Sequence, residues 1–242
     1  MKRLLLSVLM LLVAAGTALA VTRHVPAQHA TIQAAINASA YGDVVRVASG
    51  TYDDCTHQST PTDTTKCVVV MKSGVALQGE GTGATIINAR GLGRGIYCKQ
   101  VIDATIEGMT IREAFAVTHG AAIFCDSSSS PTIRNCVVRD NTDGGIIIRS
   151  NSHPNLSNVT MFRNFGKEGG GLFIDNGSNP VISSCFVDSN SAPMGGGISI
   201  KGLSAPQLVN CIIKRNWIPG ETGSGGGLTS KASTLTMTNC LV

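Results

Sequence analysis

A short repeat fills the second half of the chain and limits what it can fold into. Copies begin at residues 104, 131, 154, 180, 206 and 235, so successive starts lie 23 to 29 residues apart. Most copies end in a glycine-led apolar patch, at 120–123, 144–146, 169–172, 195–198 and 225–228. Each copy holds strand-length apolar runs without a helical period, and it is too short to bury its own apolar face. Successive copies must therefore stack on one another to close a core.

Aligned copies predict columns of interior side chains, as expected for a parallel β-helix. We expect an all-β solenoid of about eight coils over residues 43–242, with like residues about 4.8 Å apart from coil to coil. Asparagines recur at one bend and are expected to form a hydrogen-bonded ladder; they are Asn141, Asn164, Asn190 and Asn216. The clearest interior columns are Ile106, Ile133, Leu156, Ile182, Leu208 and Met237, and Ile96, Ile123, Ile146, Leu172, Ile198 and Leu228.

Composition narrows the classes of function. Charged residues make up 14% of the chain, and the net charge of +4 comes from 19 basic and 15 acidic residues scattered along it. No basic stripe of the kind that binds nucleic acid appears, so we expect no nucleic-acid partner. The hydrophobic share of 43% is too high for a disordered chain.

The first 20 residues have the pattern of a secretory signal peptide. Met1-Lys2-Arg3 supplies the positive start, an apolar run follows over 4–15, and Ala18-Leu19-Ala20 resembles a signal-peptidase site. The run is too short for a membrane span, which needs about 20 residues. We therefore predict a mature protein that does not span a membrane and that is secreted or held in the cell envelope.

The coil pattern of residues 104–242 resembles the right-handed parallel β-helix superfamily with the pectin-lyase-like fold. Residues 31–37 and 42–52 are also similar to exported bacterial members, in which this segment forms an amphipathic capping helix and a first strand. The resemblance implies a right-handed solenoid whose N-terminal cap covers residues 21–42. It says little about activity, because this fold hosts lyases, hydrolases, epimerases and non-catalytic adhesins.

Eight cysteines in an exported chain raise the question of disulfides. Six of them replace Val, Met or Ile in the interior columns, so we expect mainly reduced core residues; they are Cys98, Cys125, Cys136, Cys185, Cys211 and Cys240. Cys55 and Cys67 flank a polar loop and are the favoured disulfide pair. No cysteine or histidine spacing fits a zinc site, and no motif implies a metal or a cofactor.

One polar cluster is a candidate catalytic site. Counting back from the apolar patches places His119, Asp143 and Glu168 at one edge of three consecutive coils, where a histidine between carboxylates would act as a general base. The run from Asn141 to Gly144 also matches the acid-bearing motif of polygalacturonases. The further motifs of that family do not follow it, and Asn141 is already explained as a ladder residue, so we do not assign hydrolase activity to it.

A second candidate site is aromatic. The residue after the asparagine column reads Phe115, Thr142, Phe165, Ser191 and Trp217 in successive coils, so rings recur on alternate coils. A spacing of about 10 Å, twice the strand separation, would suit stacking along an extended polysaccharide. The alternative interpretation is that these rings cover turns or pack inward.

Three hypotheses of function follow. The first is a non-catalytic extracellular or cell-surface module that binds glycans, the second a polysaccharide lyase, glycoside hydrolase or epimerase, and the third a structural stalk. The chain stops inside a strand at Leu241-Val242 without a cap. We therefore expect a C-terminally truncated member of the superfamily that self-associates through its uncapped last coil.

Overall fold

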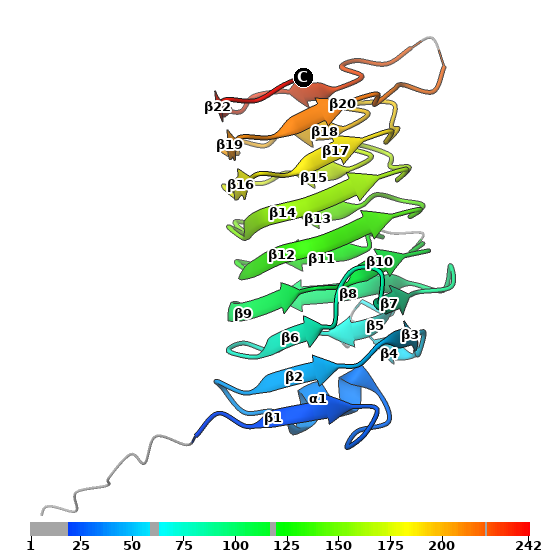
Figure 1. Ribbon diagram of the computed structural model, residues 1–242. Helices are drawn as coiled ribbons and strands as arrows, with labels where there is room; N and C mark the ends of the chain where they lie inside the picture. Colours follow the sequence, from blue (N-terminus) through cyan, green and yellow to red (C-terminus); the bar gives the residue numbers. More distant parts are fainter. Residues whose placement is uncertain (1–18, 59–62, 117–119, 221) are drawn as a thin grey trace, which may run out of the picture.

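The protein is a stack of parallel coils (Figure 1). The structure, a computed structural model, describes residues 19–58, 63–116, 120–220 and 222–242. Strands of successive repeats pair in parallel and build about eight turns of a right-handed β-solenoid, with β1 at one end and β22 at the other. Among the described strands the antiparallel pairing is confined to β4 and β5. The predicted fold class is confirmed.

The larger sheet has two rows of strands, which meet in the long strands β12 (Ser130–Arg139) and β14 (Asn155–Phe162). The first row also contains β1 (Thr22–Val25), β2 (Val44–Val47), β6 (Ala76–Gly79), β9 (Ile102–Glu107), β16 (Val181–Ser183), β19 (Gln207–Val209) and β22 (Thr236–Thr238). The second row also contains β3 (Gly50–Tyr52), β7 (Thr85–Asn88), β10 (Thr110–Arg112), β17 (Phe186–Asp188) and β20 (Ile212–Lys214).

The smaller sheet forms the opposite wall of the coils. Its eight strands are β4 (His57–Gln58), β5 (Lys66–Val70), β8 (Arg94–Lys99), β11 (Ile123–Asp126), β13 (Ile146–Ile148), β15 (Leu172–Ile174), β18 (Ile198–Ile200) and β21 (Leu228–Ser230). Ile146 pairs with Ile123 on one side and Leu172 on the other, and in the larger sheet Ile133 pairs with Ile106 and Leu156. The predicted interior columns are therefore in register.

The N-terminal end is covered by α1 (Ile32–Ala38). Thr31 caps the helix by accepting a hydrogen bond from the backbone N–H of Ala34, and Ile32, Ala35 and Ile36 face the core as expected. The sequence did not indicate β1, which precedes the helix and pairs with β2, so paired coils begin inside the segment expected to be only a cap. In the described residues no helix has the length and apolar character needed to cross a membrane.

A ladder of buried serines lines a second bend. The backbone N–H of Ser129 donates to Oγ of Ser152 at 3.1 Å, and the N–H of Ser152 donates to Oγ of Ser178 at 3.2 Å. The ladder continues through Ser204 to Ser233. Each hydroxyl thus satisfies a turn amide that the coil would otherwise bury without a partner.

The stacked cysteines are core residues, as predicted. Cys98 and Cys125 lie opposite each other on β8 and β11, and five of the six stacked thiols are buried, Cys240 being half-buried. Burial raises the pKa of Cys136 to about 12, which keeps its thiol protonated. Cys55 is also a buried thiol, whose sulfur lies 3.9 Å from the Arg94 carbonyl oxygen. The favoured Cys55–Cys67 disulfide is therefore not formed in this structure.

Candidate functional site

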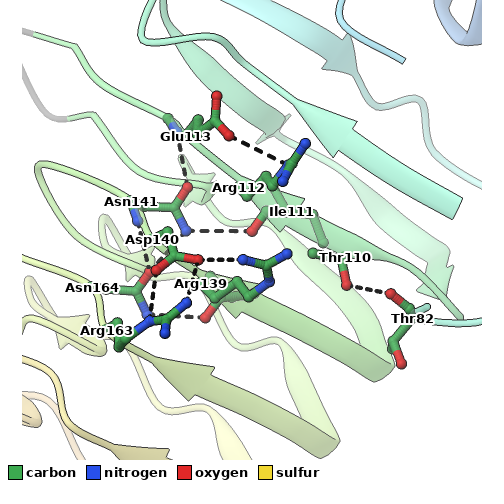
Figure 2. A network of polar contacts seen from close by, with 12 residues as sticks. Thr82, Thr110, Ile111, Arg112, Glu113, Arg139, Asp140, Asn141, Arg163 and Asn164 are labelled. Atoms are coloured by element: carbon green, nitrogen blue, oxygen red, sulfur yellow. Dashed lines mark hydrogen bonds and ion pairs between the residues drawn. The ribbon is translucent and has the colours of Figure 1, made fainter. Parts of the chain in front are cut away.

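A bend after the second row of strands organises the polar groups of one edge of the solenoid (Figure 2). Arg163 adopts a positive φ of 52°, which turns the chain so that Asn164 points inward and is 1% exposed. Nδ2 of Asn141 donates to Oδ1 of Asn164 at 2.8 Å, and Nδ2 of Asn164 donates to Oδ1 of Asn190 at 2.9 Å. The predicted asparagine ladder is therefore present and structural.

Ion pairs line the outer side of the same bend (Figure 2). The guanidinium of Arg163 donates to both carboxylate oxygens of Asp140, at 2.8 and 3.0 Å, and Arg139 donates to the same carboxylate. Partial burial works against the charge of Asp140, but the hydrogen bonds from the two arginines outweigh it and lower the pKa of this carboxyl. Partly exposed pairs of this kind stabilise a fold weakly, so we interpret the cluster as structural.

The structure describes two members of the candidate catalytic trio, Asp143 and Glu168. His119 lies outside the described residues. Asp143 is 9% exposed and accepts a hydrogen bond from the backbone N–H of Gly120 at 2.7 Å, and its other oxygen lies 3.6 Å from Nζ of Lys167. Glu168 forms an ion pair with Lys201 at 2.9 Å. Both carboxylates therefore have cationic or amide partners of their own, and the geometry of the full trio stays a prediction.

The aromatic column is present and faces outward. Bridges pair Thr142 with Phe165, Phe165 with Ser191 and Ser191 with Trp217, so the predicted register is present from Thr142 to Trp217. Phe115, Phe165 and Trp217 are 43%, 45% and 54% exposed, which rules out the interpretation that they pack inward. Two coils separate Phe165 from Trp217, which places their backbones about 10 Å apart.

A hollow adjoins the first ring of this column. It has a volume of about 430 Å³ and is lined by Phe115 and Ala116, by Gly91 and Leu92, and by residues 64–66. Apolar residues, two threonines and a lysine thus surround one space. Such a mixture of apolar surface and a few polar groups is typical of small-ligand sites.

Sequence reasoning missed an aromatic cluster on the outer face of the smaller sheet. The rings of Tyr97 and Phe124 lie 5.4 Å apart, and the guanidinium of Arg94 lies 5.0 and 4.7 Å from their centroids. Arg94 also forms an ion pair with Asp63 at 2.7 Å, and burial raises the pKa of Tyr97 to about 12. The sequence did carry a signal for this cluster: an aromatic residue stands between two interior residues in both Ile-Tyr-Cys and Ile-Phe-Cys. The sequence analysis considered only the inward-facing positions of these strands.

No metal centre is visible where side chains are described. Over residues 19–58, 63–116, 120–220 and 222–242, no three His, Cys, Asp or Glu side chains come together in a way that would hold an ion.

Comparison with known families identifies the chain. The profile described as "Right handed beta helix region" matches residues 73–242, which is more than half of the sequence. The chain belongs to the right-handed β-helix family. No curated protein matches it.

Two solved structures match this β-helix protein at low identity. The A-module of mannuronan C-5 epimerase AlgE4 from Azotobacter vinelandii is 14% identical, with a TM-score of 0.35, and the match covers 82% of this chain and 68% of that one. A rhamnogalacturonan lyase is 15% identical, with a TM-score of 0.33, and the match covers 85% of this chain and 56% of the lyase. At these identities and TM-scores, neither match indicates an activity for this chain.

Proposed function

We propose that this protein is an extracellular, non-catalytic module that binds a polysaccharide along its aromatic column. The observation that carries the proposal is the outward exposure of Phe115, Phe165 and Trp217, of which Phe165 and Trp217 share one register along the solenoid. Large exposed aromatic surfaces on a rigid scaffold are typical of binding sites, because the ring buries much area on contact without losing many rotamers.

The parallel ladder supports a linear ligand. Each coil repeats the backbone of the coil before it, so Phe165 and Trp217 lie two coils apart along the solenoid axis. A polymer with a regular repeat meets such a pair with the same face each time. The hollow beside Phe115 offers a further subsite for this ligand.

Binding fits the described carboxylates better than catalysis does. A general acid or base must be available to the reacting group. Asp143 is held by the Gly120 amide and Lys167, and Glu168 is held by Lys201. The secreted or envelope location predicted from the leader would bring the column into contact with extracellular polysaccharide.

Affinity electrophoresis in gels that contain single polysaccharides tests the proposal. We expect the wild-type protein to be retarded by at least one of them, and Phe165→Ala and Trp217→Ala each to weaken binding about 5- to 30-fold, which corresponds to a loss of about 1 to 2 kcal/mol.

The matched control is Phe186→Ala, which removes a half-buried ring on β17 outside the column, where Lys214 covers it. Equal retardation of the Trp217→Ala variant and the wild type would contradict the proposal. Release of unsaturated or reducing sugar ends by the wild-type protein would instead support the enzyme hypothesis.

A further inference from the structure

A polar groove crosses several coils on another face of the molecule. Two neighbouring hollows, of about 430 and 370 Å³, share Gly81, Gly108 and Asn135 and together form this groove. Its polar walls carry Arg46, Gln78, Glu80, Glu107, Asn135, Asn158 and Thr160. The groove lies over the bend between the two rows of strands and reaches Val137 and Thr160 of the second row, whereas the aromatic column follows the bend after that row.

We propose that this groove is a second binding site, which takes a neutral, hydroxyl-rich oligosaccharide. The choice of a sugar rests on the proposed function, whereas the groove itself is a separate surface with its own residues.

Glycines line the bend of the groove. One bend column reads Gly108, Asn135 and Asn158 in successive coils, all with positive φ, of 69°, 52° and 51°. At Gly108 a Cβ would lie 2.8 Å from the Gly79 carbonyl oxygen, so the backbone packs too closely there for the side chain that the next coils carry. Beside it, a Cβ on Gly79 would lie 2.3 Å from the Gly108 carbonyl oxygen, so close coil packing also requires glycine there.

The polar groups of the groove are held in place. Glu80 accepts hydrogen bonds from Oγ and the backbone N–H of Ser49, at 2.7 and 2.9 Å, and these bonds, with the nearby Arg46, lower the pKa of its carboxyl. Nδ2 of Asn158 donates to Oδ1 of Asn135 at 2.8 Å. Oriented carboxylate and amide groups of this kind bind hydroxyls well, because little freedom is lost on contact.

The wall next to Thr82 is also fixed. Oγ1 of Thr110 donates to the Thr82 carbonyl oxygen at 2.6 Å, which ties the 80–82 turn to the next coil (Figure 2).

Charge and length define the ligand. Glu80 and Glu107 are balanced by Arg46 and by Arg134, which forms an ion pair with Glu107, so the groove favours neither anions nor cations. Each coil contributes one polar side chain to the groove, because Gln78 pairs with Arg46 on one side and with Glu107 on the other. With Arg134 in the next coil, this line spans about 15 Å, which suits a short oligosaccharide.

Nuclear magnetic resonance titration of the full chain with neutral tetrasaccharides of glucose, mannose and N-acetylglucosamine tests the site. We expect at least one of them to shift the amide signals of Gly81, Gly108 and Asn135. Glu80→Gln and Asn135→Ala should each weaken this binding about tenfold or more, because each removes a hydrogen bond, that of Glu80 being to a charged group.

Asn210→Ala is the matched control. Asn210 occupies the same bend column with a φ of 55° but does not line the groove. Asn210→Ala therefore places alanine at a positive φ, as Asn135→Ala does, and should leave the affinity for the sugar unchanged. Shifts confined to Phe165 and Trp217 would overturn the second site and leave the proposed function standing. Shifts in the groove without any change at the column would support the second site and contradict the proposed function. No shift with any of the sugars would overturn the second site.

Discussion

Replacing Asn164 with alanine tests whether the asparagine ladder holds the coils together. Nδ2 of Asn164 donates to the Val138 carbonyl at 3.0 Å and to Oδ1 of Asn190 at 2.9 Å. Its Oδ1 accepts from Nδ2 of Asn141 at 2.8 Å and from the Asn141 backbone N–H at 3.2 Å. The variant loses all four bonds at a position that is 1% exposed.

The expected cost follows from this inventory. A buried hydrogen bond contributes a net of about 1 kcal/mol, and a buried group left without a partner costs about 1 to 3 kcal/mol. The Val138 carbonyl and the Asn141 amide lose the partner that Asn164 provides. We therefore expect the free energy of unfolding to fall by about 3 kcal/mol, which is a large part of the roughly 5 to 15 kcal/mol that stabilises most domains.

Urea denaturation followed by circular dichroism measures this change from the shift of the midpoint. The control is Asn158→Ala in β14, the strand that precedes Asn164, which removes an exposed ladder bond of 2.8 Å to Asn135 and leaves alanine at a φ of 51°. We expect this control to lose about 1 kcal/mol. Equal losses in the two variants would refute the argument that buried amides, more than the bend itself, stabilise the stack.

Three further outcomes are expected. Ser152→Ala should lower the free energy of unfolding by about 1 to 2 kcal/mol in the same assay, because the N–H of Ser129 loses its acceptor inside the turn. Asp140→Asn should destabilise the protein at neutral pH but not at pH values below the lowered pKa of Asp140. The reason is that the ion pair with Arg163 contributes fully above the unfolded-state pKa of Asp140 and is lost as the pH falls through its folded-state pKa. A loss of stability that does not change with pH would contradict this. Gly171→Ala should lower the melting temperature, since its Cβ would lie 2.9 Å from Nδ2 of Asn190, whereas Gly83→Ala, with no atom within 4 Å of the added Cβ, should not.

The interior of the solenoid could be predicted from the sequence because its columns repeat like residues. Ile133 and Leu156 pair as aligned, and Asn141 and Asn164 bond as expected. Burial and stacking act on every coil, so the same chemistry returns at the same position. The serine ladder has such a signal too: Ser129, Ser152, Ser178 and Ser204 each stand two residues before a proline, but the alignment did not follow this column.

Features without a repeat could not be found in this way. The polar groove brings Glu80 and Glu107 together from coils of unlike sequence, and its bend carries glycine where later coils carry asparagine. Gln33 is another example. Its side-chain oxygen accepts a hydrogen bond from the Val70 amide at 2.6 Å. This contact depends on how the capping helix packs against the first coils, and the helical pattern of the sequence does not indicate it.

Trp217 allows the central claim, that polysaccharide stacks on the aromatic column, to be measured directly. It is the single tryptophan of the chain and is 54% exposed, so its fluorescence reports from one ring of the column. Titration with the polysaccharide that retards the protein should shift the emission to shorter wavelength in a saturable manner, because the ring leaves water. The Phe165→Ala variant should need a higher concentration for the same shift. An emission spectrum that stays unchanged at concentrations that fully retard the protein would contradict binding at this column.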